Sequence, residues 1–354
     1  MTRQRFSSQQ LSDFATSILT AQGVPEPDAE IVSASLVAAD MGGHESHGML
    51  RLPWYSARLS SGAMSARTDP VVVTDAGAMT ILDGRDGIGQ VLVDRAMSRA
   101  MENAERFGIG AVGVRNSNHF GTAGHWTRSM AERGYVGILL TNSSPSMAPW
   151  GGLAKTVGSN PWSIATPGGP HGSVVLDISN SMVARGKIYA AIQNDADIPD
   201  TWALDAEGRA TTDPHAALQG TLQPIGEHKG YGISFMIDML AGVLTGSGYA
   251  DQVVGPYSAT GRSRCGHLVI AIKTDACLPR DELLKRADDL VELTVWGPLA
   301  ADSARIFVPG DHESENLERA RLEGVQLPER TVSDLNELAV SLNVDNRLVA
   351  VAGS

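Results

Sequence analysis

The chain has 354 residues, of which 42% are hydrophobic and 19% charged, a composition typical of a soluble globular protein of about two domains. Its formal net charge is −12 and no run of Lys and Arg exceeds two residues, which argues against an extended surface for nucleic acid or anionic membrane. Cys265 and Cys277 fit neither a disulfide scaffold nor a zinc pattern, and the N-terminus lacks the apolar core of a leader, so we expect a cytoplasmic protein that enters no membrane.

Three helical segments are predicted first. Residues 7–23 begin with a serine cap signal and end at a glycine, and residues 25–43 carry acids in their first turn and end at a Gly-Gly pair. Residues 46–62 form the third segment. Pro53 inside it means that this helix is either kinked or starts late.

The pattern changes near residue 70, where two short strands around a turn are predicted over 71–84. Helices and strands then alternate. Helices are expected near 90–106, 122–133, 182–194 and 229–246, and strands near 110–115, 135–142, 162–167, 173–178 and 267–274. The 229–246 helix is so rich in apolar residues that we expect it to be mostly buried. Helices return at 280–295, 313–324 and 331–343, so that a helical head and tail, which can pack together as one domain, flank an α/β body.

The stretch GIGAVG at residues 108–113 matches the dinucleotide-binding string G-x-G-x-x-G. That fingerprint requires a strand before the glycines and a helix after them, so that the helix N-terminus faces the pyrophosphate. Here the order is reversed, because a helical pattern precedes Gly108 and a short apolar strand follows it. We therefore interpret Gly108 as the residue that ends a helix.

His47, Arg51 and Tyr55 are spaced four residues apart, which on a helix places them along one stripe. An imidazole can pass a proton to a carbonyl oxygen, a guanidinium can hold a carboxylate, and a phenol can add a hydrogen bond. The set is chemically coherent. An unrelated solvent-facing stripe is the alternative that the spacing alone leaves open.

His44, Glu45 and His47 also invite a metal-ion interpretation. Their H-E-x-H order differs from the H-E-x-x-H of zinc enzymes, because a spacing of three lacks the i, i+4 pairing, and no third ligand is apparent. We expect no metal at this place.

Polar residues also gather where predicted strands end. His119 follows the strand at 110–115 and precedes a helix, and ligands of α/β sheets usually bind at such loops; a plain helix cap at Thr122 is the alternative. Asp177 ends another strand, and Lys229 begins the apolar helix, where it is placed to neutralise a phosphate. Ordinary turns and an exposed lysine are the alternatives.

Taken together, these segments resemble the malate/L-lactate dehydrogenase family that lacks a Rossmann fold. That family also contains ureidoglycolate and sulfolactate dehydrogenases, 2,3-diketogulonate reductase and piperideine-2-carboxylate reductase. The matching motifs are SHG-x-x-R-x-P (46–53), RNSNHFG (115–121), TNS (141–143), PWG (149–151), GSNP (158–161), LDIS (176–179), KG (229–230) and PG-x-H-E (309–313). The family usually has G-T-N-P, L-D-M and G-H-E. The extra Asp311 leaves the register of the last loop open.

The resemblance implies an α/β (α+β) fold in which a non-Rossmann, mixed-sheet domain, residues 73–294, binds NAD or NADP. Residues 1–72 and 295–354 would form a helical domain for substrate binding and dimerisation, and the chain would be a homodimer. The implied reaction transfers hydride between the nicotinamide and a small 2-hydroxy or 2-oxo acid. Reduction of a cyclic 2-imino acid such as piperideine-2-carboxylate is the alternative.

The resemblance also assigns roles to residues. It gives catalytic proton transfer to His47, with His119 as the other histidine that has this role in some members, and it gives substrate contacts to Arg51 and Tyr55. Asp177 would orient the catalytic groups. Cofactor contacts pass to Ser143, Asp177, Ile178, Ser179, Lys229, Gly310, His312 and Glu313. On this interpretation the chain binds a dinucleotide, but not through the glycines at 108–113.

Overall fold

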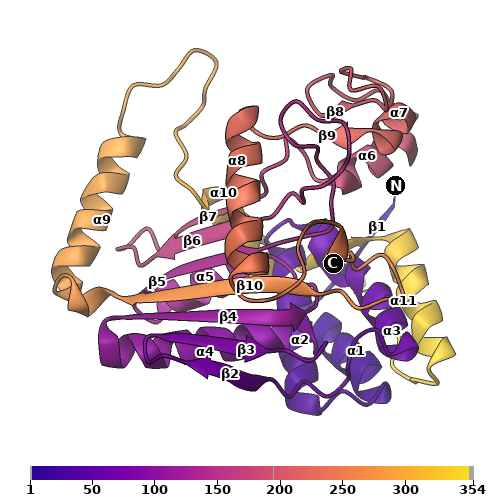
Figure 1. Ribbon diagram of the computed structural model, residues 1–354, viewed down its shortest axis with the longest axis horizontal. Coiled ribbons are helices and arrows are strands. Elements are labelled where there is room, and N and C mark those ends of the chain that lie inside the picture. Colours follow the sequence, from indigo (N-terminus) through magenta and orange to yellow (C-terminus); the bar gives the residue numbers. More distant parts are fainter. Residues whose placement is uncertain (1, 194, 351–354) are drawn as a thin grey trace.

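A seven-stranded sheet lies at the centre of the computed structural model, which describes residues 2–193 and 195–350 (Figure 1). In spatial order its strands are β2 (Val71–Asp75), β3 (Met79–Asp83), β4 (Ile109–Ser117), β10 (Cys265–Lys273), β5 (Tyr135–Thr141), β6 (Trp162–Thr166) and β7 (Val174–Ile178). Only β3 and β4 are parallel neighbours; the other pairs are antiparallel. This sheet confirms the predicted mixed α/β class.

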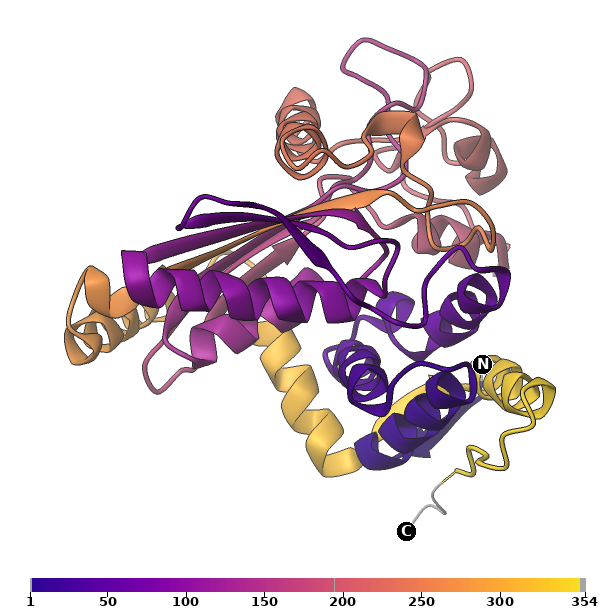
Figure 2. The ribbon, with the colours of Figure 1, turned by 60° about the horizontal axis from the view of Figure 1, so that its bottom comes forward.

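Helices cover both faces of this sheet (Figure 2). On one face lie α4 (Gly89–Phe107) and α5 (Ala123–Glu132), whose apolar side chains form a core with β4, β5 and β10. On the other face lie α8 (His228–Ile237) and the π-helical turn η3 (Asp238–Val243). The inner strands β4 and β10 are mostly buried because both of their faces are covered.

The two ends of the chain share a second core. It contains side chains from α1 (Ser8–Ala21), α2 (Glu26–Met41), α3 (Leu52–Ser61) and α11 (Glu329–Ser341), together with the start of α4. Strand β1 (Arg3–Phe6) pairs antiparallel with β11 (Val325–Pro328), so the first and last segments lie side by side. Neither of these strands was predicted, because their four residues are too few to show a periodic pattern.

Two smaller parts complete the molecule. Residues 147–157 and 183–222 contribute to a separate small core, around which lie α6 (Arg185–Gln193), α7 (Pro214–Gln219), β8 (Ala203–Leu204) and β9 (Thr221–Leu222). The short helix η4 (Ala250–Gln252) precedes β10. The short helix η5 (Thr274–Ala276) and the long helices α9 (Arg280–Val295) and α10 (Asp311–Glu323) follow it. Before α10 the chain returns to the sheet, where the Val175 N–H donates to the carbonyl of Pro309.

The predicted end of a helix at Gly108 is confirmed, because this residue closes α4 with a φ of 80°, a left-handed conformation that suits glycine. The prediction that residues 229–246 are mostly buried is wrong. Phe235, Met236 and Leu244 are 47%, 54% and 57% exposed. Apolar periodicity marks a face that avoids water, but it does not say whether the same chain covers that face. No helix in the described residues is long and apolar enough to cross a membrane.

Candidate active site

The segment that carries His47 is a pair of tight turns and not a continuous helix. After α2 ends, η1 (Glu45–His47) and η2 (Met49–Arg51) lead into α3, which starts late, at Leu52, with Pro53 in its first turn. Proline fits there because a first-turn residue needs no N–H partner within the helix. The single-helix stripe predicted for His47, Arg51 and Tyr55 is therefore wrong in its geometry.

His47 nevertheless lies next to His119, the histidine that follows β4. The two ring centroids are 5.4 Å apart and nearly stacked. The Tyr55 hydroxyl lies 2.7 Å from Nδ1 of His119, and the N–H of Gly121 donates to the same nitrogen over 3.3 Å. A backbone N–H can only donate, so Nδ1 of His119 is an acceptor and the proton of the neutral ring is on Nε2.

Burial sets the charge of this cluster. It lowers the pKa of His47 to about 3, with further lowering from Arg51 and His44, and it lowers the pKa of His119 well below its usual value. Burial also raises the pKa of Tyr55 to about 12. At neutral pH both imidazoles are thus uncharged, and the phenol keeps its proton to donate to His119.

Arg51 is the positive charge beside these neutral rings. Its Nε donates to the carbonyl of Ser46, and its guanidinium carbon lies 4.2 Å from the centroid of the Trp54 ring. No carboxylate of the described residues forms an ion pair with it, so its terminal nitrogens are available for a ligand. The hydroxyl of Ser46 lies 2.9 Å from Nδ1 of His47. The sequence analysis missed Ser46; its position next to His47 was the available signal.

A second group of titratable residues, Asp177, His44 and Glu313, lies beside the His47–His119 cluster. Asp177, on β7, accepts the N–H of Gly124 at the start of α5 over 2.7 Å, and burial raises the pKa of this carboxyl. His44 lies 3.5 Å from Glu313 of α10, and this contact raises the pKa of His44 and lowers that of Glu313. Since Asp177 also raises the pKa of His44, the three side chains share one electrostatic environment.

His125 was also missed by the sequence analysis. It lies in the first turn of α5, one residue after Gly124, with its ring 4.7 Å from that of Trp126. Burial lowers its pKa to about 4, so that it too is neutral at pH 7. Nothing in its local sequence, GHW, marked it as different from a core histidine.

Glu45, the glutamate of the H-E-x-H sequence at residues 44–47, does not share a partner with the two histidines. Glu45 forms an ion pair with Arg3, with nitrogen and oxygen 2.7 Å apart, while His44 contacts Glu313. In the part of the chain that the structure describes, the three-donor group with metal-ligand spacing is a different one, formed by His171 of the loop between β6 and β7 with Asp288 and Glu292 of α9.

The other residues assigned to the cofactor form two groups. Ser143 lies two residues after β5, and Ser179 directly follows Ile178, the last residue of β7. The carboxyl ends of β5 and β7 lie at the same edge of the sheet, because both strands are antiparallel to β6 between them. Asn160 links this edge to α8: its side chain accepts the N–H of Ser143 and donates to the carbonyl of Ser234. Lys229 lies in the first turn of α8.

The second group is the loop before α10. Gly310 has a φ of 96° and its Cα packs against Val175 of β7. The Asp311 carboxylate accepts the N–H of Val308 within its own loop, while His312 stacks on Phe307 and Glu313 reaches His44. Among the three side chains at 311–313, Glu313 is therefore the one directed toward the histidine cluster.

Lys229, in the first turn of α8, is suited to a phosphate. It is exposed and pairs with no carboxylate of the described residues. The N–H groups of Lys229 and Gly230 already donate to the carbonyls of Gly226 and Ile225, and the N-cap residue is Glu227, so the lysine side chain is the group available to an anion. By contrast, α10 has Asp311 and Glu313 in its first turn, which disfavour a phosphate there.

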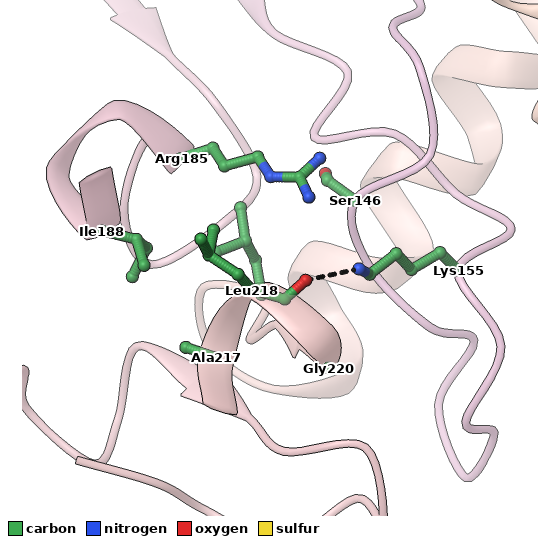
Figure 3. Close-up of a pocket in the computed structure, with 8 residues that line it drawn as sticks. Ser146, Lys155, Arg185, Ile188, Ala217, Leu218 and Gly220 are labelled. Atoms are coloured by element: carbon green, nitrogen blue, oxygen red, sulfur yellow. Dashed lines mark hydrogen bonds between the residues drawn. The ribbon is translucent and has the colours of Figure 1, made fainter. Parts of the chain in front are cut away.

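Two cavities lie outside the histidine cluster. One, about 10 Å³, is lined by Ser146, Lys155 and Arg185 in the small core (Figure 3). It has room for about one water molecule, too little for a substrate. The amine of Lys155 donates to the carbonyl of Leu218 there, and burial lowers the pKa of this lysine. The other cavity, about 360 Å³, lies between α5, α9 and α10.

Comparison with known proteins gives consistent matches over the whole length. A family model described as malate/L-lactate dehydrogenase matches residues 6–336. The L-sulfolactate dehydrogenase of Methanothermobacter thermautotrophicus is 35% identical over 96% of this chain and 98% of its own. The NADP⁺-dependent (2R)-3-sulfolactate dehydrogenase of Chromohalobacter salexigens is 35% identical over 95% of this chain and 98% of its own. The solved structure of the sulfolactate dehydrogenase from Methanocaldococcus jannaschii has a TM-score of 0.91 at 33% identity, covering 96% of this chain and 98% of that one.

Proposed function

This chain belongs to the malate/L-lactate dehydrogenase family and is an NAD(P)-dependent 2-hydroxy acid dehydrogenase, and we propose that His47, His119 and Arg51 are the groups that act on its substrate. One observation carries this proposal: a guanidinium without a carboxylate partner lies beside two neutral imidazoles. That arrangement suits a small acid whose carboxylate binds the arginine while the neighbouring C2 oxygen exchanges a proton.

Arg51 is the residue that we assign to the substrate carboxylate. Its Nε is already bonded to the Ser46 carbonyl and its plane packs on Trp54, so the guanidinium is held before the substrate arrives. A planar, preset donor loses little freedom on binding and fixes the orientation of a carboxylate. It would hold C2 of the acid beside the histidines.

His47 is the residue that we assign to proton transfer at the C2 oxygen. In the direction of alcohol oxidation a neutral imidazole is the form that accepts the hydroxyl proton, and burial keeps His47 in that form. The positive charge of Arg51 contributes to its low pKa. A bound carboxylate offsets that charge, so the proton that His47 accepts is better tolerated once the substrate is present. The nicotinamide, when bound, supplies the hydride acceptor or donor.

His119 and Tyr55 support this step in our proposal. Tyr55 donates to Nδ1 of His119 and thereby leaves the Nε2–H of that ring as a donor. A neutral donor near the C2 oxygen would stabilise the negative charge that builds up on it. Tyr55 then acts mainly through His119. Asp177 raises the pKa of His44, and the charge of His44 in turn lowers the pKa of His47.

We assign the cofactor to the edge of the sheet formed by the ends of β5 and β7. Lys229 is proposed to hold phosphate oxygens. The remaining proposed contacts are Ser143, Asp177, Ile178, Ser179, Gly310, His312 and Glu313. The bonded network of Ser143, Asn160 and Ser234 supports this assignment, since it fixes the edge against α8.

We further propose that the chain works as a cytoplasmic homodimer. The exposed apolar face of α8 and η3 supports a second copy as its cover, because a monomer rarely exposes so many large apolar side chains on one element. The two free cysteines support a reducing compartment. In the same proposal residues 73–294 bind the cofactor, and residues 1–72 and 295–354 form the helical domain. Residues 1, 194 and 351–354 of these ranges lie outside the described residues.

The test of the proposed function is a substrate panel. Nicotinamide absorbance is followed with NADH and NADPH separately, against pyruvate, oxaloacetate, sulfopyruvate and piperideine-2-carboxylate. We expect turnover of at least one 2-oxo acid, and a fall in activity when Arg51 is replaced. Turnover of the cyclic imine alone would contradict the proposal, as would cofactor binding without turnover of any 2-oxo acid.

A further inference from the structure

Asp40 lies directly behind the turn that carries His47. It is the penultimate residue of α2, and its Oδ2 accepts the backbone N–H of Met49 over 2.7 Å. This bond spans nine residues and closes the loop formed by the end of α2, η1 and η2. His47 lies within that loop, two residues before the bonded N–H.

Gly48 makes this contact possible. A Cβ at this position would lie 2.1 Å from the carboxyl carbon of Asp40, so the backbone next to His47 packs directly against the carboxyl group. The carboxyl thus fixes two consecutive residues, Gly48 by packing and Met49 by a hydrogen bond. Because both follow His47 immediately, a shift of the carboxyl would move the imidazole.

The charged groups around Asp40 come from two other elements. Glu45 of η1 carries a negative charge that reaches the carboxyl, and Arg3 of β1, which pairs with Glu45, partly offsets it. The remaining partner is the Met49 N–H of η2. No side chain donor of the described residues bonds to Asp40, so the backbone of the turn is its hydrogen-bond partner.

We propose that Asp40 is a positioning residue for proton transfer: its carboxyl group holds the 44–49 turn in the conformation that places His47 beside Arg51 and His119. The inference rests on the proposed role of His47. It concerns a residue that touches neither substrate nor cofactor and acts through the backbone that it fixes.

Ionisation of Asp40 provides a readout that a purely structural residue would not give. Burial raises the pKa of its carboxyl to about 7, while the Met49 bond opposes this rise. A carboxylate accepts a stronger hydrogen bond than a carboxylic acid. The turn is therefore held more tightly above pH 7 than below it, and we expect kcat to rise with pH through this range. His44, whose pKa is also raised, is the other group of the turn that can titrate in this window.

The test compares Asp40→Ala and Asp40→Asn with wild type across pH 5.5 to 8.5. Misplacing a catalytic group by about 1 Å costs up to about a hundredfold in rate, so we expect Asp40→Ala to lower kcat roughly tenfold to a hundredfold with little change in the KM of the cofactor. Asp40→Asn keeps an oxygen acceptor for the Met49 N–H. It should restore most of kcat at pH 8 and remove the step near pH 7. Asp28→Asn, on the same helix and paired with Arg95, is the matched control and should behave as wild type.

A double variant separates this inference from the function on which it rests. In a His47→Asn background there is no imidazole to position, so Asp40→Ala should cause little further loss. If His47→Asn alone keeps near-normal turnover, the proposed role of His47 has failed. If His47→Asn is crippled but folded Asp40→Ala keeps wild-type kcat, the positioning role is overturned. A step near pH 7 that persists in Asp40→Asn also overturns it, and assigns the titration to His44.

Discussion

The sequence drew attention to both the histidine cluster and the α8–η3 helix, but the described chain buries only the first. The apolar face of the second stays exposed. Around His47 and His119 the described residues bury nearly every group, and the terminal nitrogens of Arg51 and Nε2 of each imidazole are left for a ligand. On α8 and η3, large apolar side chains such as Phe235 and Met236 stay exposed. In our proposal, the first region binds a small molecule and the second binds another copy of the chain.

The difference shows that burial and polarity have to be considered together. Polar groups in the cluster are costly to bury, and hydrogen bonds to Ser46, Tyr55 and Gly121 offset that cost. The apolar groups on α8 are costly to expose and no part of the described chain covers them. In each region, the group that lacks a partner therefore indicates the kind of partner that we propose: a carboxylate for Arg51 and an apolar protein surface for α8.

The largest effect is expected at His47. His47→Asn removes the proton acceptor while it keeps the side-chain volume similar, so kcat should fall by about two to four powers of ten, the usual scale of general acid–base catalysis. Steady-state rates at saturating cofactor measure this. His215→Asn, at an exposed position of α7, is the control. If His119→Asn has the larger effect, the two histidines exchange roles.

A charge placed on the exposed apolar face of α8 should weaken dimerisation. Met236→Glu places a carboxylate in the proposed interface, where burying it costs several kcal/mol, so dimerisation should weaken by roughly two or more powers of ten. Sedimentation or light scattering over a range of concentrations gives the monomer–dimer equilibrium. Leu293→Glu, which alters another large apolar residue that is exposed, on α9, should leave the equilibrium unchanged. A monomeric wild-type protein would show that α8 is not covered by a second copy.

A smaller effect is expected at Arg51. Arg51→Lys keeps the charge but loses the planar pair of donors, which costs about one charge-assisted hydrogen bond, or roughly 1.5–3 kcal/mol. The KM of the 2-hydroxy acid should rise about tenfold to a hundredfold, and the KM of the cofactor should stay the same. Arg99→Lys, at a surface pair with Asp75, is the control. An unchanged substrate KM would remove Arg51 from the carboxylate site.

The smallest effect concerns stability in acid. The folded-state pKa of His125 is about 4, below its ordinary value, so its neutral form stabilises the fold above pH 6.5 and that contribution is lost as pH falls toward 4. At pH 5 the cost is about 2 kcal/mol. Relative to His125→Gln, wild type should therefore lose unfolding free energy between pH 7 and pH 5 in urea titrations. The exposed His215→Gln should follow the wild-type curve; a His125→Gln curve parallel to it would show that His125 is not buried in its neutral form.

Much of the fold was predictable because its elements are long and regular. The helix that ends at Gly108 and the strand that follows it are recognisable from periodicity and a single glycine, and the same reasoning rejected a nucleotide loop there. The pairing of β1 with β11 was not predictable, because four-residue strands far apart in the chain carry no mutual signal. Likewise, spacing alone could not separate a covered helix from an exposed one at 229–246.

The sequence singled out the residues of the candidate site but did not predict their geometry. His47 and Arg51 drew attention by their chemistry, but the tight turns that present them depend on Asp40 and Gly48, which no spacing rule selects. His119 lies 72 positions after His47, so their contact follows from the packing of the head onto the sheet. Neutral imidazoles are a consequence of burial, and burial at this place is a property of the fold.

The central claim is that His47 is a neutral base held beside an arginine that waits for a carboxylate. The most direct measurement is an NMR titration of the His47 ring proton, assigned by comparison with His47→Asn, in the free enzyme and with a non-reacting 2-oxo acid analogue and cofactor bound. In the free enzyme the signal should not titrate between pH 5 and pH 8, and the bound carboxylate should raise its pKa. A His47 signal that titrates near pH 6.5 in the free enzyme and does not move on binding would contradict the account.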